Sequence, residues 1–240
     1  MRLKYQRLFV SLCLLVLASL LCACAGKTVN GPSALDAARD AALGGHAPDF
    51  AALRKLNPDI VAWLSAPNAG ISEPVLQRAG DDTYYASHAP DGTQNAGGSV
   101  YSQSAYNAVD FTDPITVLYG SEATPGRQFS SLQRTFSEDG SLSRAGDILV
   151  YTPDGTLKYR TFAAGLFNSS HLLHDYHGLR NTEEMESFLS AFRNYHAMSR
   201  QLDETITLSD SDQLLILSTH VPQNEDLRFL VVARLVAETG

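Results

Sequence analysis

Eight short apolar segments separated by turn-forming residues constrain the fold of this chain more than any other feature. The segments are rich in β-branched and aromatic residues, and 17 glycines and 10 prolines are scattered along the chain. This pattern is typical of strands joined by turns. The predicted strands are 60–64, 73–77, 98–101, 115–119, 147–152, 157–166, 214–218 and 229–236. Eight strands of this kind favour a closed barrel, because closure leaves no strand edge exposed.

Helices are expected at both ends of this region. Two short ones are predicted over 34–43 and 49–56, before the first strand. A longer one is predicted over 181–199, where Asn181 and Glu184 resemble a capping box. Its apolar residues recur with the spacing of one helix face: Met185, Phe188, Leu189 and Phe192. The sequence therefore predicts a mainly β fold, an eight-stranded barrel with N-terminal helices and one long helix before the last two strands.

The first 23 residues predict a lipoprotein signal peptide. Basic residues at positions 2, 4 and 7 precede an uncharged apolar run over 8–21, which is short for a membrane span. Leu21-Cys22-Ala23-Cys24 is similar to a bacterial lipobox, which would make Cys24 the lipid-modified first residue of the mature protein. An ordinary signal peptide or an uncleaved anchor is the alternative. Acyl chains on Cys24 would hold the protein at the extracytoplasmic face of the cell membrane.

Segment 24–47 is rich in small residues and proline, and we expect it to be a tether between the membrane and a domain over 48–240. Cleavage before Cys24 would leave a mature chain with no internal disulfide and no thiol nucleophile, because the other cysteines are Cys13 and Cys22. Loss of the three basic residues would also change the formal net charge from −8 to −11. An acidic chain without a basic cluster argues against a nucleic-acid partner, and no cofactor-binding motif is found.

Several motifs, in order along the chain, resemble those of class B sortases. Leu217-Ser218-Thr219-His220, with Arg228 soon after, is similar to the active-site strand of that family. Tyr119-Gly120-Ser121 is similar to its Tyr-Gly-His motif. The other matching segments are 57–64, 73–77, 81–88 and 97–101, together with Phe129 and Leu132. The resemblance extends from about Leu53 to Val236 and implies the sortase barrel.

The resemblance also implies a mechanism and three site residues. In a sortase, a cysteine attacks the carbonyl of a threonine in a sorting signal, a histidine protonates the leaving amine, and an arginine stabilises the oxyanion. In this chain His220 stands at the cysteine position and Ser121 at the histidine position, while Arg228 matches the arginine. Imidazole does not form the usual thioester, and a serine hydroxyl has no pKa near 7.

Three functions remain open at this point. The first is a catalytically inactive sortase scaffold that binds a sorting-signal-like peptide of a secreted or wall-linked protein, or assists the anchoring of surface proteins. The second is an active hydrolase or transpeptidase with Ser121 as nucleophile and His220 as base, which requires about 3 Å between Oγ and a ring nitrogen. The third is a structural component of a surface assembly.

One histidine run stands apart from these motifs. His171, His174 and His177 are spaced three residues apart, and two histidines at this spacing on a helix can share a metal while the third points away. A polar loop is the simpler interpretation, and no metal site is predicted. The resemblance to class B sortases implies that this connection forms a wall of the substrate groove.

Overall fold

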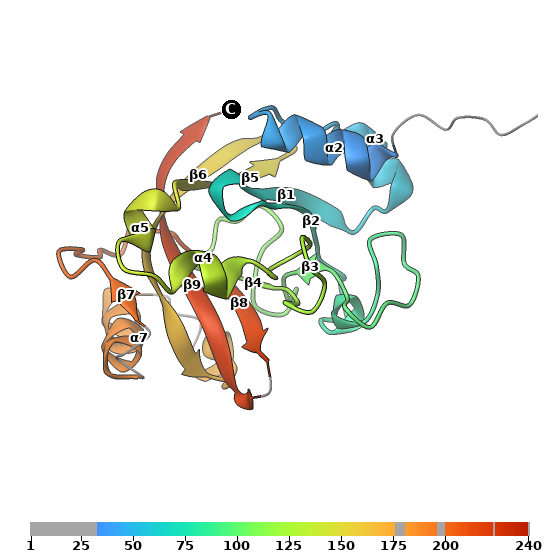
Figure 1. Ribbon diagram of the computed structural model, residues 1–240. Coiled ribbons are helices and arrows are strands. Elements are labelled where there is room, and N and C mark those ends of the chain that lie inside the picture. Colours follow the sequence, from blue (N-terminus) through green and yellow to red (C-terminus); the bar gives the residue numbers. More distant parts are fainter. Residues whose placement is uncertain (1–32, 176–180, 196–199, 223, 240) are drawn as a thin grey trace, which may run out of the picture. The chain divides into compact units, whose positions relative to one another are not determined.

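The fold is built around a mixed sheet that closes on itself, as the computed structural model shows (Figure 1). The structure describes residues 33–175, 181–195, 200–222 and 224–239. The described residues from Ala34 onward belong to one unit. Within the described residues, no helix combines the length and the apolar character that crossing a membrane requires. The predicted signal peptide, with Cys24, lies outside the described residues.

Eight strands form the ring, in the order β5-β1-β2-β3-β4-β8-β9-β6, and the pairing of β5 with β6 closes it. Two neighbouring pairs, β2–β3 and β4–β8, are parallel, and the other ring pairs are antiparallel. The strands are β1 Ile60–Ala66, β2 Ile71–Leu76, β3 Val100–Tyr101, β4 Ile115–Tyr119, β5 Asp147–Thr152, β6 Gly155–Asn168, β8 Leu214–Val221 and β9 Asn224–Thr239. The predicted closed eight-stranded barrel is thereby confirmed.

A ninth strand, β7 (Gln201–Leu202), was not predicted. It pairs with Ala163 and Ala164 of β6, beyond the stretch of β6 that pairs with β5. A strand of two residues is too short to show the alternation of apolar and polar residues by which strands are predicted.

Residues 214–217 of β8 and 229–233 of β9 are buried on both faces, which explains why these stretches are continuously apolar. Leu215 and Leu217 of β8 belong to the core inside the barrel, whereas Leu214 and Ile216 belong to a second core on the outside. Helix α7 (Thr182–Asn194) supplies the cover for that outer face. Its four predicted apolar residues, Met185, Phe188, Leu189 and Phe192, are all buried there. The Asn181 side chain caps α7 by accepting the Glu184 N–H at 2.9 Å, as the sequence predicts.

The two predicted N-terminal helices are present as α2 (Ala34–Leu43) and α3 (Phe50–Leu56). Ala38 and Ala42 of α2 are buried in a third apolar cluster around Trp63 of β1. The Ser65 hydroxyl donates to the Ala42 carbonyl at 3.3 Å, which ties the end of α2 to β1. The predicted tether, 24–47, therefore overlaps a helix that packs on the barrel from Ala34 onward. The remainder of that range up to residue 32 is outside the described residues.

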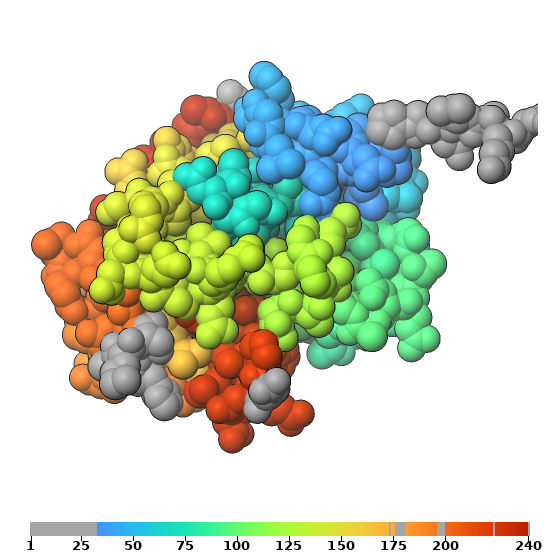
Figure 2. Space-filling view, viewed as in Figure 1, coloured from blue at the N-terminus to red at the C-terminus, as the bar shows by residue number. Residues whose placement is uncertain are grey.

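The remaining helices are short. They are the 3-10 turns η2 Pro67–Ala69 and η3 Tyr84–Ala86, and the α-helices α4 Leu132–Phe136, α5 Ser141–Arg144 and α6 Leu172–Asp175. The segment that carries α4 and α5, coloured yellow-green, lies on the viewed face between the N-terminal helices and the C-terminal strands (Figure 2). Phe129, Leu132 and Phe136 of this segment fill the barrel core from that side.

A buried carboxylate joins α2 to this segment. Glu73 of β2 is 3% exposed, and its Oε1 lies 3.1 Å from a guanidinium nitrogen of Arg39 and 3.3 Å from Nε of Arg127. The same oxygen accepts the backbone N–H of Gln128 at 3.0 Å. A charge at this depth is tolerated because two cations and a hydrogen bond compensate it.

We predict that Glu73→Gln lowers the free energy of unfolding by about 2 kcal/mol, because both guanidinium groups lose their anionic partner. Urea denaturation measures this change. Glu138→Gln is the matched control, since the Glu138–Arg144 pair is exposed on both sides (76% and 61%) and such pairs contribute little. Equal effects of the two substitutions would contradict this account of Glu73.

Candidate functional site

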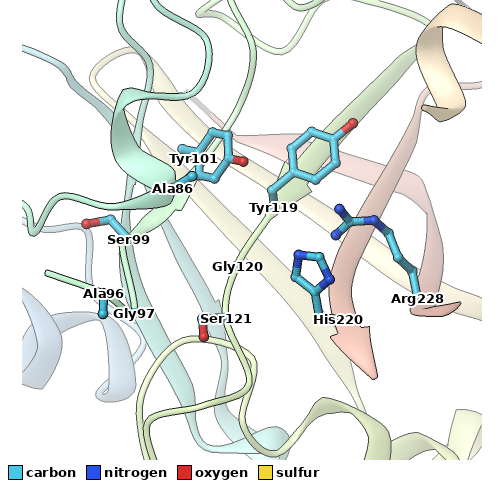
Figure 3. A pocket seen from close by; sticks show the side chains of 10 residues that line it. All are labelled: Ala86, Ala96, Gly97, Ser99, Tyr101, Tyr119, Gly120, Ser121, His220 and Arg228. Carbon is cyan, nitrogen blue, oxygen red and sulfur yellow. The ribbon is translucent and has the colours of Figure 1, made fainter. Parts of the chain in front are cut away.

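A cleft of about 190 Å³ opens at the edge of the barrel where β4 and β8 end and β9 begins (Figure 3). Its walls come from three parts of the chain: the segment 86–101, the end of β4, and the β8–β9 hairpin. The lining residues are Ala86, Ala96, Gly97, Ser99, Tyr101, Tyr119, Gly120, Ser121, His220 and Arg228. The three site residues predicted from the sequence, Ser121, His220 and Arg228, thus lie around one cleft.

Strand pairing explains why these three residues meet. β4 and β8 run parallel, with Tyr119 opposite Ser218, so both chains leave the sheet at the same edge. The Gly120 N–H extends this pairing by donating to the Ser218 carbonyl at 3.2 Å. β8 and β9 are antiparallel, and their register places His220 directly opposite Arg228.

The Ser121 side chain is engaged on the side away from His220. Its Oγ accepts the N–H of Ala123 at 3.1 Å, and Figure 3 shows the hydroxyl pointing away from the imidazole ring. Across the described part of the chain, no hydrogen bond joins Ser121 to His220. In this arrangement the serine hydroxyl is not hydrogen-bonded to the base that would activate it.

His220 sits at the exposed rim of the cleft and has a lowered pKa. Partial burial of the ring is the largest cause, and the positive charge of Arg228 is the second. The carboxylates of Glu122 and Glu225 act in the opposite direction without cancelling the shift. Because the pKa lies below the ordinary value of 6.5, the imidazole is neutral at pH 7.

Arg228 points into the cleft beside an aromatic pair. Its Cζ lies 5.8 Å from the ring centroid of Tyr119, and Figure 3 shows the guanidinium between the Tyr119 and His220 rings. Tyr101 stacks on Tyr119 with ring centroids 5.5 Å apart. Burial raises the pKa of both tyrosine hydroxyls, so neither is an anion that neutralises Arg228 at neutral pH.

Gln128 organises the cleft, and sequence reasoning missed it. Its amide nitrogen donates to the carbonyls of Gly97 and Gly98, at 2.9 Å each. Its Oε1 accepts the N–H of Ser121 at 2.8 Å. One buried side chain thereby joins two walls of the cleft. No motif marks this glutamine, although its neighbour Phe129 is among the residues that resemble the sortase pattern.

Two glycines allow the close contacts around Gln128. Gly98 has a φ of +59°, and a Cβ at this position would lie 2.4 Å from the Tyr85 carbonyl oxygen. A Cβ on Gly120 would lie 2.7 Å from Cδ2 of Phe129. Any larger residue at either position would displace a wall of the cleft.

His171, the first histidine of the run, lies beside the cleft and is not among its lining residues. The His171 ring is 6.5 Å from that of Tyr119, and its Nε2 is 2.8 Å from Oε1 of Gln103. Its Nδ1 accepts the N–H of His174 at 3.1 Å, so both ring nitrogens are engaged. His177 is outside the described residues, and no group of three or more His, Cys, Asp or Glu side chains in the described part is arranged to hold a metal.

Comparisons with known proteins identify the architecture. The chain is similar to a sortase B of Clostridium perfringens, with a TM-score of 0.63 and 20% identity over 79% of this chain and all of that one. A Streptococcus pyogenes class B sortase involved in pilus biogenesis gives 0.63 and 21%, over 78% and 98%. This chain has the class B sortase fold. A Staphylococcus aureus sortase B solved with its substrate also matches, at 0.63 and 20%, over 78% and 84%.

Sequence comparison supports the same relationship over a shorter stretch. The chain is 32% identical over 87 residues to the sortase B of Listeria monocytogenes. The match spans 36% of this chain and 35% of that protein, so it covers about a third of the curated relative's length. No family model matches the chain. The class B sortase fold therefore rests mainly on the structural comparison.

We predict that Gln128→Ala loosens the cleft, because the Ser121 N–H and the two glycine carbonyls lose their partner. A buried backbone group without a partner costs about 1–3 kcal/mol, so the amide of Ser121 should exchange with solvent at least about tenfold faster. Hydrogen–deuterium exchange measures this rate. Gln133→Ala on α4 is the control, as no hydrogen bond of the Gln133 side chain is found in the described part of the structure. An unchanged Ser121 rate would refute the role of Gln128.

Proposed function

We propose that this chain is a lipid-anchored sortase-like protein that binds a peptide segment of a secreted or wall-linked protein without cleaving it. The observation that carries the proposal is the chemistry of the cleft. Arg228 is present at the site, but the positions beside it hold His220 and Ser121. All three cysteines of the chain lie within the first 24 residues, so the barrel unit from Ala34 onward has no thiol to form an acyl intermediate.

Several contacts support a peptide ligand in particular. The cleft is open to solvent along the edge where β4 and β8 end and β9 begins, and its walls combine aromatic rings with polar side chains. Such a mixture suits an extended peptide, whose backbone needs hydrogen-bonding partners while its side chains need apolar contact. A sortase B of the same fold has been solved with its substrate, and the proposal assigns a comparable ligand to this chain.

A serine hydrolase or transpeptidase is the second candidate. The shared cleft of Ser121 and His220 favours it, and so does the neutral state of His220, since a general base must be unprotonated. Against it stands the hydrogen bond from the Ala123 N–H to Ser121 Oγ. Rotation of the Ser121 side chain toward His220 would have to break that contact.

We predict that the wild-type protein binds peptides in the cleft but turns none over. Ala96→Trp should weaken binding at least about tenfold, because an indole at this exposed lining position fills the cleft. Ala51→Trp, on the exposed face of α3, should leave binding unchanged. Fluorescence anisotropy with a labelled peptide library measures the affinities.

Labelling with a serine-directed fluorophosphonate separates the two candidates. We expect no covalent adduct on Ser121 and no release of product when an amine acceptor is added. An adduct that Ser121→Ala and His220→Ala both abolish would establish the hydrolase and refute the binding-only proposal.

The lipid anchor is part of the proposal and rests on the sequence around Cys24. The small residues before this cysteine and the apolar run over 8–21 support lipid modification. Two or more acyl chains give stable membrane attachment, whereas one does not.

We predict that metabolic labelling with a fatty-acid analogue marks the wild-type protein and that Cys24→Ser abolishes the label. Cys22→Ser is the matched control, because it changes a cysteine two residues away and leaves the proposed acceptor in place. Equal labelling of the wild type and Cys24→Ser would place the acyl chain elsewhere.

A further inference from the structure

The cleft carries an uncompensated positive charge. None of its ten lining residues is Asp or Glu, and Arg228 is the one lining residue with a fixed charge. His220 is mainly neutral at pH 7, because burial and Arg228 lower its pKa. The cleft is therefore a positive site on a chain whose formal net charge is −8.

Arg228 differs from the other arginines in the described residues. Seven of them lie within 4 Å of a carboxylate: Arg39, Arg127, Arg144, Arg160, Arg193, Arg200 and Arg234. Of the four without such a partner, Arg54, Arg78 and Arg134 are exposed and can be hydrated. Arg228 is half-buried. Its five N–H donors make no hydrogen bond to any described residue, so a ligand that supplies acceptors would satisfy a partly desolvated cation.

One further donor lies beside Arg228. The neutral imidazole of His220 carries one N–H, and it lies opposite Arg228 on the neighbouring strand. The Ser121 hydroxyl also lines the cleft, but it accepts from Ala123 on the side away from His220. The nearby carboxylates Glu122 and Glu225 influence His220, but neither lies within ion-pair distance of Arg228.

The geometry of these donors favours a carboxylate. A guanidinium presents a planar fork that matches the two oxygens of a carboxylate. A dianionic phosphate would need more positive charge than one arginine in an acidic protein offers. The cleft volume of about 190 Å³ is below the range of about 300–1,000 Å³ typical of drug-sized ligands. It is suited to the end of a peptide.

We propose that the cleft binds the free C-terminal carboxylate of a peptide, with Arg228 as its charged partner and His220 as a neutral donor. This inference rests on the proposed peptide-binding function and names the chemical group that is recognised. A peptide whose chain continues past this point lacks the charge that Arg228 requires. The ligand class is therefore a peptide with a free carboxyl end, such as the product of a proteolytic cleavage.

The test compares two peptides that differ in one group. The full chain in mild detergent is titrated by calorimetry with acetyl-Ala-Ala-Ala-Thr carrying a free carboxylate, and with the same peptide ending in an amide. The acid should bind about ten- to a hundredfold more tightly than the amide, the range expected for a hydrogen-bonded charge. Arg228→Gln should remove the difference, and Arg54→Gln, which loses the same charge from α3, should preserve it.

A second measurement uses the wild type alone, in case Arg228→Gln does not fold. Added NaCl should weaken binding of the acid and leave the amide unaffected, because only the acid forms an ion pair. Equal affinities for acid and amide would overturn the carboxylate inference while leaving peptide binding intact. Binding of neither peptide would overturn both. Inorganic phosphate competing at lower concentration than acetate would overturn the carboxylate in favour of a phosphate ligand.

Discussion

The parallel pairing of β4 with β8 is the constraint on which the cleft depends. It makes two strands that are distant in sequence leave the barrel at the same edge, so Ser121 and His220 face one space. The antiparallel return of β9 then adds Arg228 opposite His220. Helix α7 covers the outer face of these strands with four buried apolar side chains. This packing stabilises the strands that carry Ser121, His220 and Arg228. The site is thus a consequence of strand order.

The electrostatics of the cleft follow from what surrounds it. Arg228 has no ion pair with a carboxylate among the described residues. The buried carboxylate of Glu73, by contrast, is paired with Arg39 and Arg127. Glu73 is not a lining residue of the cleft, but its carboxylate accepts the backbone N–H of Gln128. The Gln128 side chain in turn accepts the backbone N–H of Ser121. Glu73 is thus compensated by Arg39 and Arg127 and not by Arg228. This separation leaves Arg228 available to a ligand.

Much of this architecture was predictable from the sequence. The spacing of apolar residues indicates which face of a strand or helix is buried, and turn-forming residues indicate where the elements end. All eight ring strands, the two N-terminal helices and the Asn181 cap were found where the patterns indicated, whereas α7 ends at Asn194 and not at the predicted residue 199. The convergence of Ser121, His220 and Arg228 on one cleft also agrees with their places in the motifs. The orientation of the Ser121 hydroxyl was not predictable, because it depends on the turn that presents the Ala123 N–H. Gln128 was missed for a similar reason: its role comes from a positive φ of 46° and from partners 30 and 31 residues away.

The attachment of α2 has a mechanical consequence. This helix is the first described element of the barrel unit, so tension on the chain before Ala34 is carried first by its contacts. Among these is the ion pair between Arg39 and Glu73, and the same carboxylate oxygen secures Gln128. Detachment of α2 would remove one of the two cations beside Glu73, whose carboxylate also accepts the backbone N–H of Gln128. Tension on the chain before Ala34 would therefore act on contacts that are connected, through Glu73 and Gln128, to a wall of the cleft.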